Sequence, residues 1–283
     1  MTAIAKTFRL GGDLEINRLG FGAMRIVGDG IWGEPADAAN SKRVLKRAVE
    51  LGVNFIDTAD SYGPEVSERL IGEALAPYAP GVVIATKAGL TRQGPNRWAP
   101  VGRAEYLIQQ VELSLRRLKL ETIDLWQLHR IDPKTPVEES LSAVKHLQKQ
   151  GKIRHIGLSE VSVKEIEQAR KTVEIVSVQN KYNLSDRAHE DVLKYCDEHN
   201  IAFIPWFPVA AGKLAQPGGV LDEAAKKHGA TVSQLSIAWL LHHSPVILPI
   251  PGTSSVAHLE ENMKSADVTL SDAEWAEIEK AAS

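Results

Sequence analysis

The amino-acid sequence predicts an α/β fold, a (β/α)8 TIM barrel preceded by an N-terminal β-hairpin, with residues 1–283 as a single barrel domain. Short β-rich runs recur along the chain and alternate with amphipathic helical patterns, as expected of parallel strands joined by helical crossovers. Several of these runs are almost continuously apolar, which is typical of strands buried on both faces. Eight such units suit a closed barrel better than an open sheet.

The apolar runs define the expected order of the strands. A hairpin over 7–19, with glycines at its turn, comes first and is expected to cover the bottom of the barrel. The eight strands are then predicted at 18–24, 54–60, 82–87, 123–129, 153–159, 176–182, 202–208 and 246–252.

Helix signals fill the intervals between the strands. One apolar stripe is formed by Ile108, Val111, Leu115 and Leu118. Gly52 and Gly151 stand where helices should end. Capping-box patterns, which begin helices, occur at 135–138, 162–165, 231–234 and 271–274.

The composition and charge exclude several classes of partner. A net charge of −3 and a pI near 6.3 favour neither a nucleic acid nor an anionic membrane surface. No apolar run approaches the roughly 18 residues of a membrane span, and the first residues lack the apolar core of a signal peptide. The one cysteine, Cys196, fits a reducing compartment. We therefore expect a cytoplasmic protein that is a monomer or a weak homo-oligomer.

Polar side chains gather at the predicted carboxyl ends of the strands, where barrel enzymes place their active sites. Asp57, Lys87 and His129 end the second, third and fourth strands, and Tyr62 lies in the turn after Asp57. Taken singly, each could be a turn cap, a solvated strand end or a packed ring. Because successive strands are neighbours, their ends converge. An acid, a lysine, a histidine and a tyrosine at one barrel mouth form a set suited to proton transfer.

The intrinsic acidities of these groups suggest how the set would work. A free tyrosine has a pKa of about 10, too high for an efficient acid at neutral pH, and a neighbouring ammonium would lower it. A carboxylate beside the lysine keeps that ammonium charged. A histidine can orient a carbonyl oxygen and share its developing charge. A Schiff base at Lys87 is disfavoured, since it usually needs a lowered lysine pKa and Asp57 opposes this.

The segment GVNFIDTADSYG resembles the signature of the aldo-keto reductase family, and the similarity spans nearly the whole chain. The resemblance implies a barrel enzyme that reduces an aldehyde or a ketone with NADPH. It also implies that Tyr62 is the general acid, that Lys87 and Asp57 tune it, and that His129 orients the substrate.

The same resemblance implies a nicotinamide cofactor extended across the barrel mouth, without a glycine-rich Rossmann loop, which the first strand lacks. Ser159 and Gln179 would hold the carboxamide, and Trp206 would stack on the ring. Hydroxyl residues before the last barrel helix could place a phosphate at its N-terminal amides. The further contacts implied along the cofactor are Phe207, Pro208, Val209, Gly212, Lys213, Gly252, Thr253, Ser254, Ser255, His258, Glu261 and Asn262.

Two positions depart from the family pattern. Glu160 follows Ser159 where asparagine is common, and it can accept a hydrogen bond from the carboxamide but cannot donate one. Gly252, Ser254 and Ser255 stand in the segment where many relatives have lysine or arginine, so bidentate recognition of a 2′-phosphate is missing. We therefore expect NADPH as cofactor with NADH also accepted, and a preference below about a hundredfold, roughly 2.7 kcal/mol.

The expected substrate is a small carbonyl compound held by loops after the first, third and fourth strands. The candidate pocket residues are Met24, Trp32, Trp98 and Arg130. The two tryptophans favour a flat aromatic aldehyde, although shielding from solvent would explain them equally well. The segment PIPGTSSVAHLEEN is similar to that of bacterial aldo-keto reductases that include pyridoxal reductases, which makes pyridoxal a candidate substrate.

Two other classes of function compete with this interpretation. A binding or regulatory subunit that senses the nicotinamide state would turn over little, and the intact set of four residues argues against it because a sensor needs no tuned acid. A metal-dependent hydrolase lacks support. His242 and His243 are adjacent on a predicted helix and point apart, and no cluster of ligands ends a strand, so no metal site is predicted.

Overall fold

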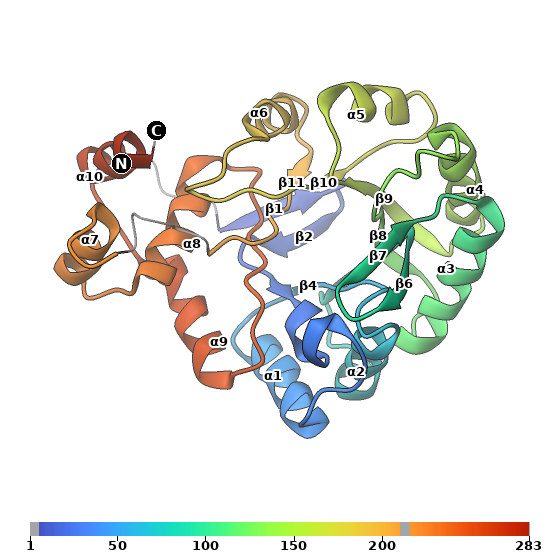
Figure 1. The fold of residues 1–283 in the computed structure, drawn as a ribbon, viewed down its shortest axis with the longest axis horizontal. Coiled ribbons are helices and arrows are strands. Elements are labelled where there is room, and N and C mark those ends of the chain that lie inside the picture. The colour runs from blue at the N-terminus through green and yellow to red at the C-terminus, as the bar shows by residue number, and fades with distance from the viewer. Residues whose placement is uncertain (1–5, 210–215, 283) are drawn as a thin grey trace.

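A curled sheet of seven parallel strands forms the centre of the computed structural model, which describes residues 6–209 and 216–282, and helices surround this sheet (Figure 1). The strands lie in the order β11-β10-β9-β8-β5-β4-β3, so those that follow one another along the chain are neighbours. Their bounds are β3 (Phe21–Gly22), β4 (Phe55–Asp57), β5 (Val83–Ala88), β8 (Ile123–Leu128), β9 (Ile153–Ser159), β10 (Ser177–Gln179) and β11 (Ala202–Phe203).

The segment 246–249 closes this sheet into a barrel. On one side Phe203 and Ile247 form a parallel bridge, and on the other the Gly20 N–H donates to the Pro249 carbonyl at 2.9 Å. This segment is the eighth predicted strand. It forms only a bridge because proline has no N–H with which to extend the ladder. The structure thus confirms the (β/α)8 barrel.

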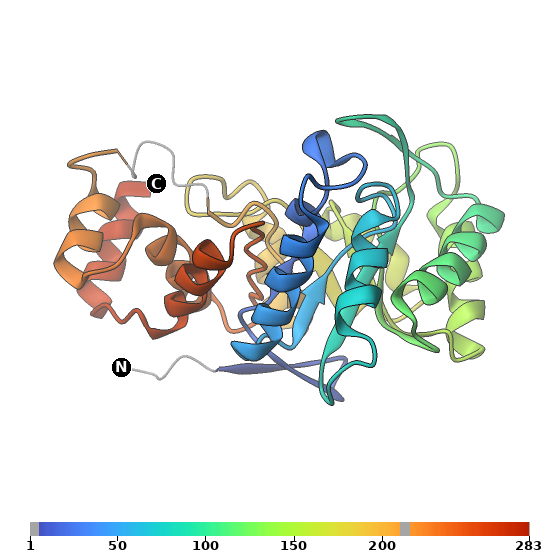
Figure 2. The same cartoon turned by 90° about the horizontal axis from the view of Figure 1, so that it is seen from below.

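A hairpin of β1 (Thr7–Leu10) and β2 (Leu14–Asn17) lies across one end of the barrel, below the strands in Figure 2. Its side chains alternate between solvent and core, as the period of two in a half-buried strand requires. The buried ones are Phe8, Leu10, Leu14 and Ile16. The predicted bottom cover is therefore confirmed.

The helices pack their apolar stripes against the outside of the strands. Ile108 was wrongly placed in such a stripe, since it is 37% exposed and Leu107 takes the buried position. Gly52 and Gly151 follow helix ends with φ of 90° and 78°, which glycine adopts without strain. No helix of the described residues has the length and apolarity to cross a bilayer. The helices are α1 (Ala38–Glu50), α2 (Val66–Leu75), α3 (Ala104–Leu118), α4 (Val137–Lys149), α5 (Val163–Arg170), α6 (Glu190–Glu198), α7 (Val220–His228), α8 (Val232–His243), α9 (Val256–Met263) and α10 (Asp272–Ala282).

Three of the four predicted capping boxes form. At the start of α5 the Ser162 hydroxyl accepts from the Glu165 N–H, and the Glu165 carboxylate accepts from the Ser162 N–H. The same reciprocal bonds occur at 231–234 and 271–274. The prediction of a capping box at Thr135 is wrong. Its hydroxyl donates to Asp132 Oδ2 instead, and α4 begins without a side-chain cap.

Candidate active site

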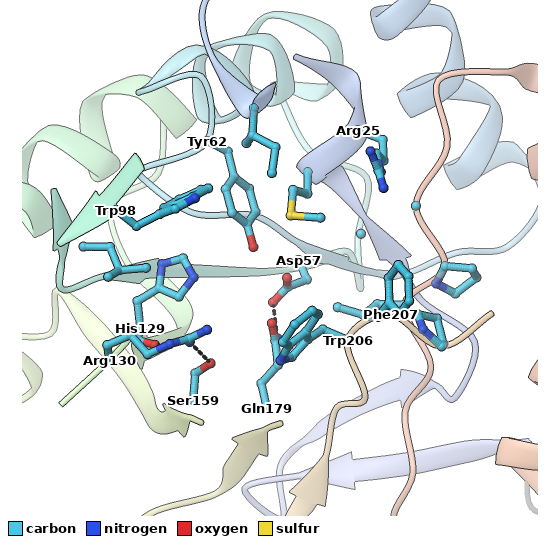
Figure 3. A pocket seen from close by; sticks show the side chains of 18 of the residues that line it. Arg25, Asp57, Tyr62, Trp98, His129, Arg130, Ser159, Gln179, Trp206 and Phe207 are labelled. Carbon is cyan, nitrogen blue, oxygen red and sulfur yellow. Dashed lines mark hydrogen bonds between the residues drawn. The ribbon is translucent and has the colours of Figure 1, made fainter. Parts of the chain in front are cut away.

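The four side chains expected to transfer a proton meet at the carboxyl end of the barrel, and Figure 3 shows three of them, Asp57, Tyr62 and His129. Asp57 ends β4, Lys87 lies near the end of β5, His129 follows β8, and Tyr62 comes from the turn after β4. All four are buried. Because parallel strands end at the same edge, residues far apart in the sequence are brought together here.

Lys87 links the carboxylate of Asp57 to the hydroxyl of Tyr62. Its Nζ donates to Asp57 Oδ1 at 2.6 Å, to the Thr58 carbonyl at 2.8 Å and to Tyr62 Oη at 3.4 Å. Burial alone would lower the pKa of Lys87, but attraction to Asp57 and Tyr62 outweighs burial and raises the pKa above its ordinary value. The lysine is therefore an ammonium at neutral pH.

Two glutamine amides hold the second oxygen of Asp57. Oδ2 accepts from Gln127 Nε2 at 3.0 Å and from Gln179 Nε2 at 2.9 Å. Gln127 was not among the predicted site residues. A glutamine within the buried apolar strand β8 was the signal for it, because such a side chain needs polar partners.

Burial sets the acidity of Tyr62. It raises the pKa of the phenol, and the nearby Lys87 ammonium lowers that pKa without overcoming the burial. The expectation of a lowered tyrosine pKa is therefore wrong for this structure. The phenol keeps its proton at neutral pH, and Lys87 stabilises the phenolate that remains once the proton has left.

His129 is a neutral imidazole beside this phenol. Burial lowers its pKa well below the ordinary value, and the positive charges of Lys87, Arg130 and Arg92 lower it further. The His129 ring meets the Tyr62 ring edge-on, with centroids 5.8 Å apart. Its Nδ1 lies 3.3 Å from the Ser61 hydroxyl, and hydrogen bonding at Nδ1 fixes which ring nitrogen carries the proton.

The phenol and the imidazole open into a cavity of about 650 Å3, a volume typical of small-molecule sites. Trp32 was wrongly assigned to its wall. That side chain does not line the cavity, it is 37% exposed, and its ring faces the Arg92 guanidinium, while the preceding Ile31 lines the cavity instead. On the substrate side the wall consists of Met24, Ile31, Leu90, Trp98, Pro100 and Arg130.

A second hairpin, β6 (Leu90–Gly94) and β7 (Arg97–Pro100), carries Trp98 over the barrel mouth, at the top of Figure 2. Arg92 fastens this hairpin to two other loops, because its Nη1 donates to the carbonyls of Ile31 at 2.5 Å and Ser61 at 2.8 Å. The same guanidinium stacks on Trp98, 3.6 Å from the ring centroid. Trp98 is therefore fixed beside the phenol.

The residues expected to hold a nicotinamide line the opposite wall of this cavity. Ser159, Gln179 and Trp206 all lie there (Figure 3). Glu160, expected to accept from the carboxamide, has protein partners in this structure. Its Oε1 accepts from Trp206 Nε1 at 2.6 Å and from the Lys181 N–H at 2.7 Å. Glu160, which stands where asparagine is common in the family, therefore fixes the orientation of Trp206.

Phe207, Pro208 and Val209 extend the same wall, whereas the predicted contacts Gly212 and Lys213 lie outside the described residues. Gly252 also lines the cavity, and its backbone packs tightly against the barrel. A Cβ at this position would lie 2.5 Å from the Gly22 carbonyl oxygen. A lysine cannot replace Gly252 on this backbone, which gives a steric reason for the missing cation.

Only part of the segment expected to bind the adenosine end of the cofactor lines a cavity. Thr253 and Ser254 line a second cavity of about 1,040 Å3 that adjoins the first at Met24, Arg25, Ile31 and Gly252. Ser255 caps the N-terminus of α9, where its hydroxyl accepts from the His258 N–H. His258, Glu261 and Asn262 lie on α9 and line neither cavity, and the Glu261 carboxylate accepts from the Thr231 hydroxyl instead.

The fold is a (β/α)8 barrel, and a buried lysine lies between a carboxylate and a tyrosine next to the cavity. These features together define a class of carbonyl-reducing barrel proteins. The profile of the Aldo/keto reductase family matches residues 18–283, and the chain belongs to this family. It is 54% identical to an uncharacterised oxidoreductase of Schizosaccharomyces pombe over 95% of this chain and 88% of that one.

Two further comparisons involve proteins with a known reaction or ligand. The chain is 42% identical to pyridoxine 4-dehydrogenase of Escherichia coli, over 95% of each chain. A crystal structure of an aldo-keto reductase from Klebsiella pneumoniae in complex with NADPH superposes with a TM-score of 0.84. The identity is 25%, over 97% of this chain and 94% of that one.

Proposed function

We propose that this protein reduces an aldehyde or a ketone to an alcohol with NADPH, and that Tyr62 donates the proton. The observation that carries the proposal is the position of the Lys87 ammonium, 2.6 Å from Asp57 Oδ1 and 3.4 Å from Tyr62 Oη, with Tyr62 in the cavity wall. The NADPH complex of the Klebsiella relative supports the cofactor.

The wall formed by Ser159, Gln179 and Trp206 fits a nicotinamide. Trp206 presents an aromatic ring fixed by Glu160, which suits stacking. The Gln179 amide nitrogen is bound to Asp57, and its amide oxygen has no hydrogen-bond partner within the described part of the chain, so it can accept from a carboxamide. When bound, the nicotinamide would supply the hydride for the reduction.

Side chains of the protein would supply and stabilise the proton that is transferred to the substrate. Tyr62 holds its proton at neutral pH and would donate it to the oxygen of the reacting carbonyl. Lys87 would stabilise the phenolate left behind, and Asp57 keeps the lysine charged and in place. We propose that the Ser61 hydroxyl donates to His129 Nδ1. His129 would then carry its own proton on Nε2 and donate from there to the same carbonyl oxygen.

For the substrate we propose pyridoxal or another small aromatic aldehyde. The relation to pyridoxine 4-dehydrogenase supports this choice, since pyridoxine is the alcohol that corresponds to the aldehyde pyridoxal. The ring of Trp98 in the cavity wall suits contact with an aromatic substrate. We further propose that residues 1–283 act as one barrel domain in the cytoplasm, where the buried thiol of Cys196 would stay reduced.

An oxidation assay tests the function. NADPH and NADH consumption would be followed with pyridoxal, methylglyoxal, 4-nitrobenzaldehyde and simple ketones. We expect NADPH-dependent reduction of the aromatic aldehydes, with NADH also used. A protein that binds NADPH and reduces none of these compounds would instead be a nicotinamide sensor.

A further inference from the structure

Arg130 places a guanidinium in the cavity wall directly after His129 in the sequence. Its Nη1 donates to the His129 carbonyl at 2.6 Å and to Ser159 Oγ at 3.0 Å (Figure 3). Its other nitrogens, Nε and Nη2, have no hydrogen-bond partner among residues 6–209 and 216–282, and no carboxylate there forms an ion pair with it. A half-buried cation thus faces the cavity with unused donors.

The charge of Arg130 is only partly offset by a neighbouring acid. Glu160 attracts the guanidinium but forms no ion pair with it, and its Oε1 accepts from Trp206 Nε1 and from the Lys181 N–H. Burial lowers the pKa of Arg130, yet an arginine starts so high that it remains charged at any working pH. A half-buried cation that has no ion-pair partner among the described residues is costly, so an anionic ligand would be favoured here.

The remaining walls on this side of the cavity limit what else the ligand can carry. Ile31, Leu90, Trp98 and Pro100 offer apolar surface. His129 is neutral, and Lys87 is fully buried, is bonded to Asp57 and does not line the cavity. Arg25, the other arginine that lines the cavity, lies on the opposite side from Arg130 (Figure 3), so an anionic group next to the place where the carbonyl meets His129 and Tyr62 would be recognised by Arg130.

We propose that Arg130 binds an oxyanion that the substrate carries on the atom next to the one bearing its carbonyl group. The preferred substrates would then be aromatic aldehydes with an ortho carboxylate or phenolate. The free edge of the guanidinium presents two parallel donors, which match a carboxylate. Pyridoxal fits this description, because its phenolic oxygen is attached to the ring carbon beside the one that bears the aldehyde. The inference rests on the proposed carbonyl reduction.

A comparison of three aldehydes tests this role. We expect kcat/KM with NADPH to be at least about tenfold higher for 2-carboxybenzaldehyde than for benzaldehyde, with 4-carboxybenzaldehyde close to benzaldehyde. Arg130→Met should reduce the first ratio at least about tenfold, mainly through KM, and Arg130→Lys should restore part of it. Arg25→Met is the matched control. It removes an exposed arginine that lines the same cavity, and the ratio should stay near that of the wild type.

The inference would be overturned by equal kcat/KM for the three aldehydes in the wild type, or by an ortho preference that survives Arg130→Met. An equal loss of the ortho preference in Arg25→Met would also overturn the inference, because the preference would then come from the overall positive charge of the cavity. Quenching of tryptophan fluorescence by the same aldehydes separates this failure from failure of the proposed function. If nothing is reduced but 2-carboxybenzaldehyde still binds more tightly through Arg130, only the carbonyl reduction is wrong.

Discussion

The phenol of Tyr62 is controlled by two opposing effects at the scale of single residues. Burial raises its pKa and Lys87 lowers it, with burial the stronger. A raised pKa means that the proton stays bound to higher pH. We therefore expect kcat/KM for aldehyde reduction to change little between about pH 6 and 9, and to fall only above about pH 10, the ordinary value for tyrosine. A decline centred below pH 9 in the pH profile would contradict this assignment of the acid.

His129 gives a second pH effect, this time on stability. In the folded state its pKa lies well below the ordinary value near 6.5, so the unfolded chain binds a proton that the folded chain does not. The free energy of unfolding should therefore decrease as the pH falls below about 6.5, by up to about 1.4 kcal/mol per pH unit from this group.

Denaturant unfolding at several pH values measures this slope. His129→Asn should flatten it, while His146→Asn, at an exposed position of α4, should keep it. An unchanged slope in His129→Asn would show that the imidazole is not a neutral buried group.

The sequence could identify the residues of the site but not how each one is held. Asp57, Tyr62, Lys87 and His129 follow from a long local motif and from the convergence of strand ends. The balance between burial and charge at Tyr62 depends on the surroundings in three dimensions, and so the direction of its pKa was predicted wrongly. The bond from Trp206 to Glu160 joins two loops, and neither loop predicts it.

At the scale of elements, the β6–β7 hairpin depends on one side chain. Arg92 ties the hairpin to the loops that contain Ile31 and Ser61 and supports the ring of Trp98. We expect Arg92→Met to raise KM for an aromatic aldehyde about fivefold or more and to change the Kd of NADPH less than about twofold, since only the substrate wall is loosened.

Arg97→Met is the control on the same hairpin. Arg97 is exposed, and its side chain makes no hydrogen bond or ion pair with the described residues, so KM should stay near the wild-type value. Steady-state kinetics of both variants measure the difference. An equal effect of the two substitutions would mean that the hairpin is disturbed in a general way.

The regular elements were predictable where the local pattern agrees with the packing. The parallel strands, the β1–β2 hairpin and three capping boxes follow from apolar runs and from residue types at fixed spacing. The β6–β7 hairpin was missed because its sequence, from Leu90 to Pro100, has no apolar run and is held by Arg92 rather than by an apolar face. Thr135 failed as a cap because Asp132 takes its hydroxyl, a choice that the four-residue pattern does not contain.

At the scale of the whole molecule, cofactor binding should stabilise the folded barrel. NADPH at a hundred times its Kd should raise the free energy of unfolding by about 2.7 kcal/mol. NADH at the same concentration should stabilise less but still by more than about 0.4 kcal/mol, since a preference below about a hundredfold leaves NADH above its own Kd. A weak preference is expected because Gly252 cannot be replaced by a lysine and the segment 250–262 has no arginine. Unfolding curves with each cofactor test this. Strong stabilisation by NADPH with none by NADH would contradict the expected weak selectivity.

The two ends of the barrel differ in role, since one end is closed by a packed hairpin and the other carries the candidate catalytic residues. The β1–β2 hairpin covers the bottom with an apolar face, while the strand ends at the top carry the buried lysine, carboxylate and phenol. The central claim is that the phenol of Tyr62 is the proton donor.

The most direct test is Tyr62→Phe, which removes only the hydroxyl. The rate of NADPH-dependent aldehyde reduction should fall at least about a hundredfold, the usual contribution of a general acid, while the Kd of NADPH stays within about threefold of the wild-type value. Both quantities can be measured on one preparation, by single-turnover kinetics and by cofactor titration. A variant that binds NADPH and reduces aldehydes at the wild-type rate would contradict the claim.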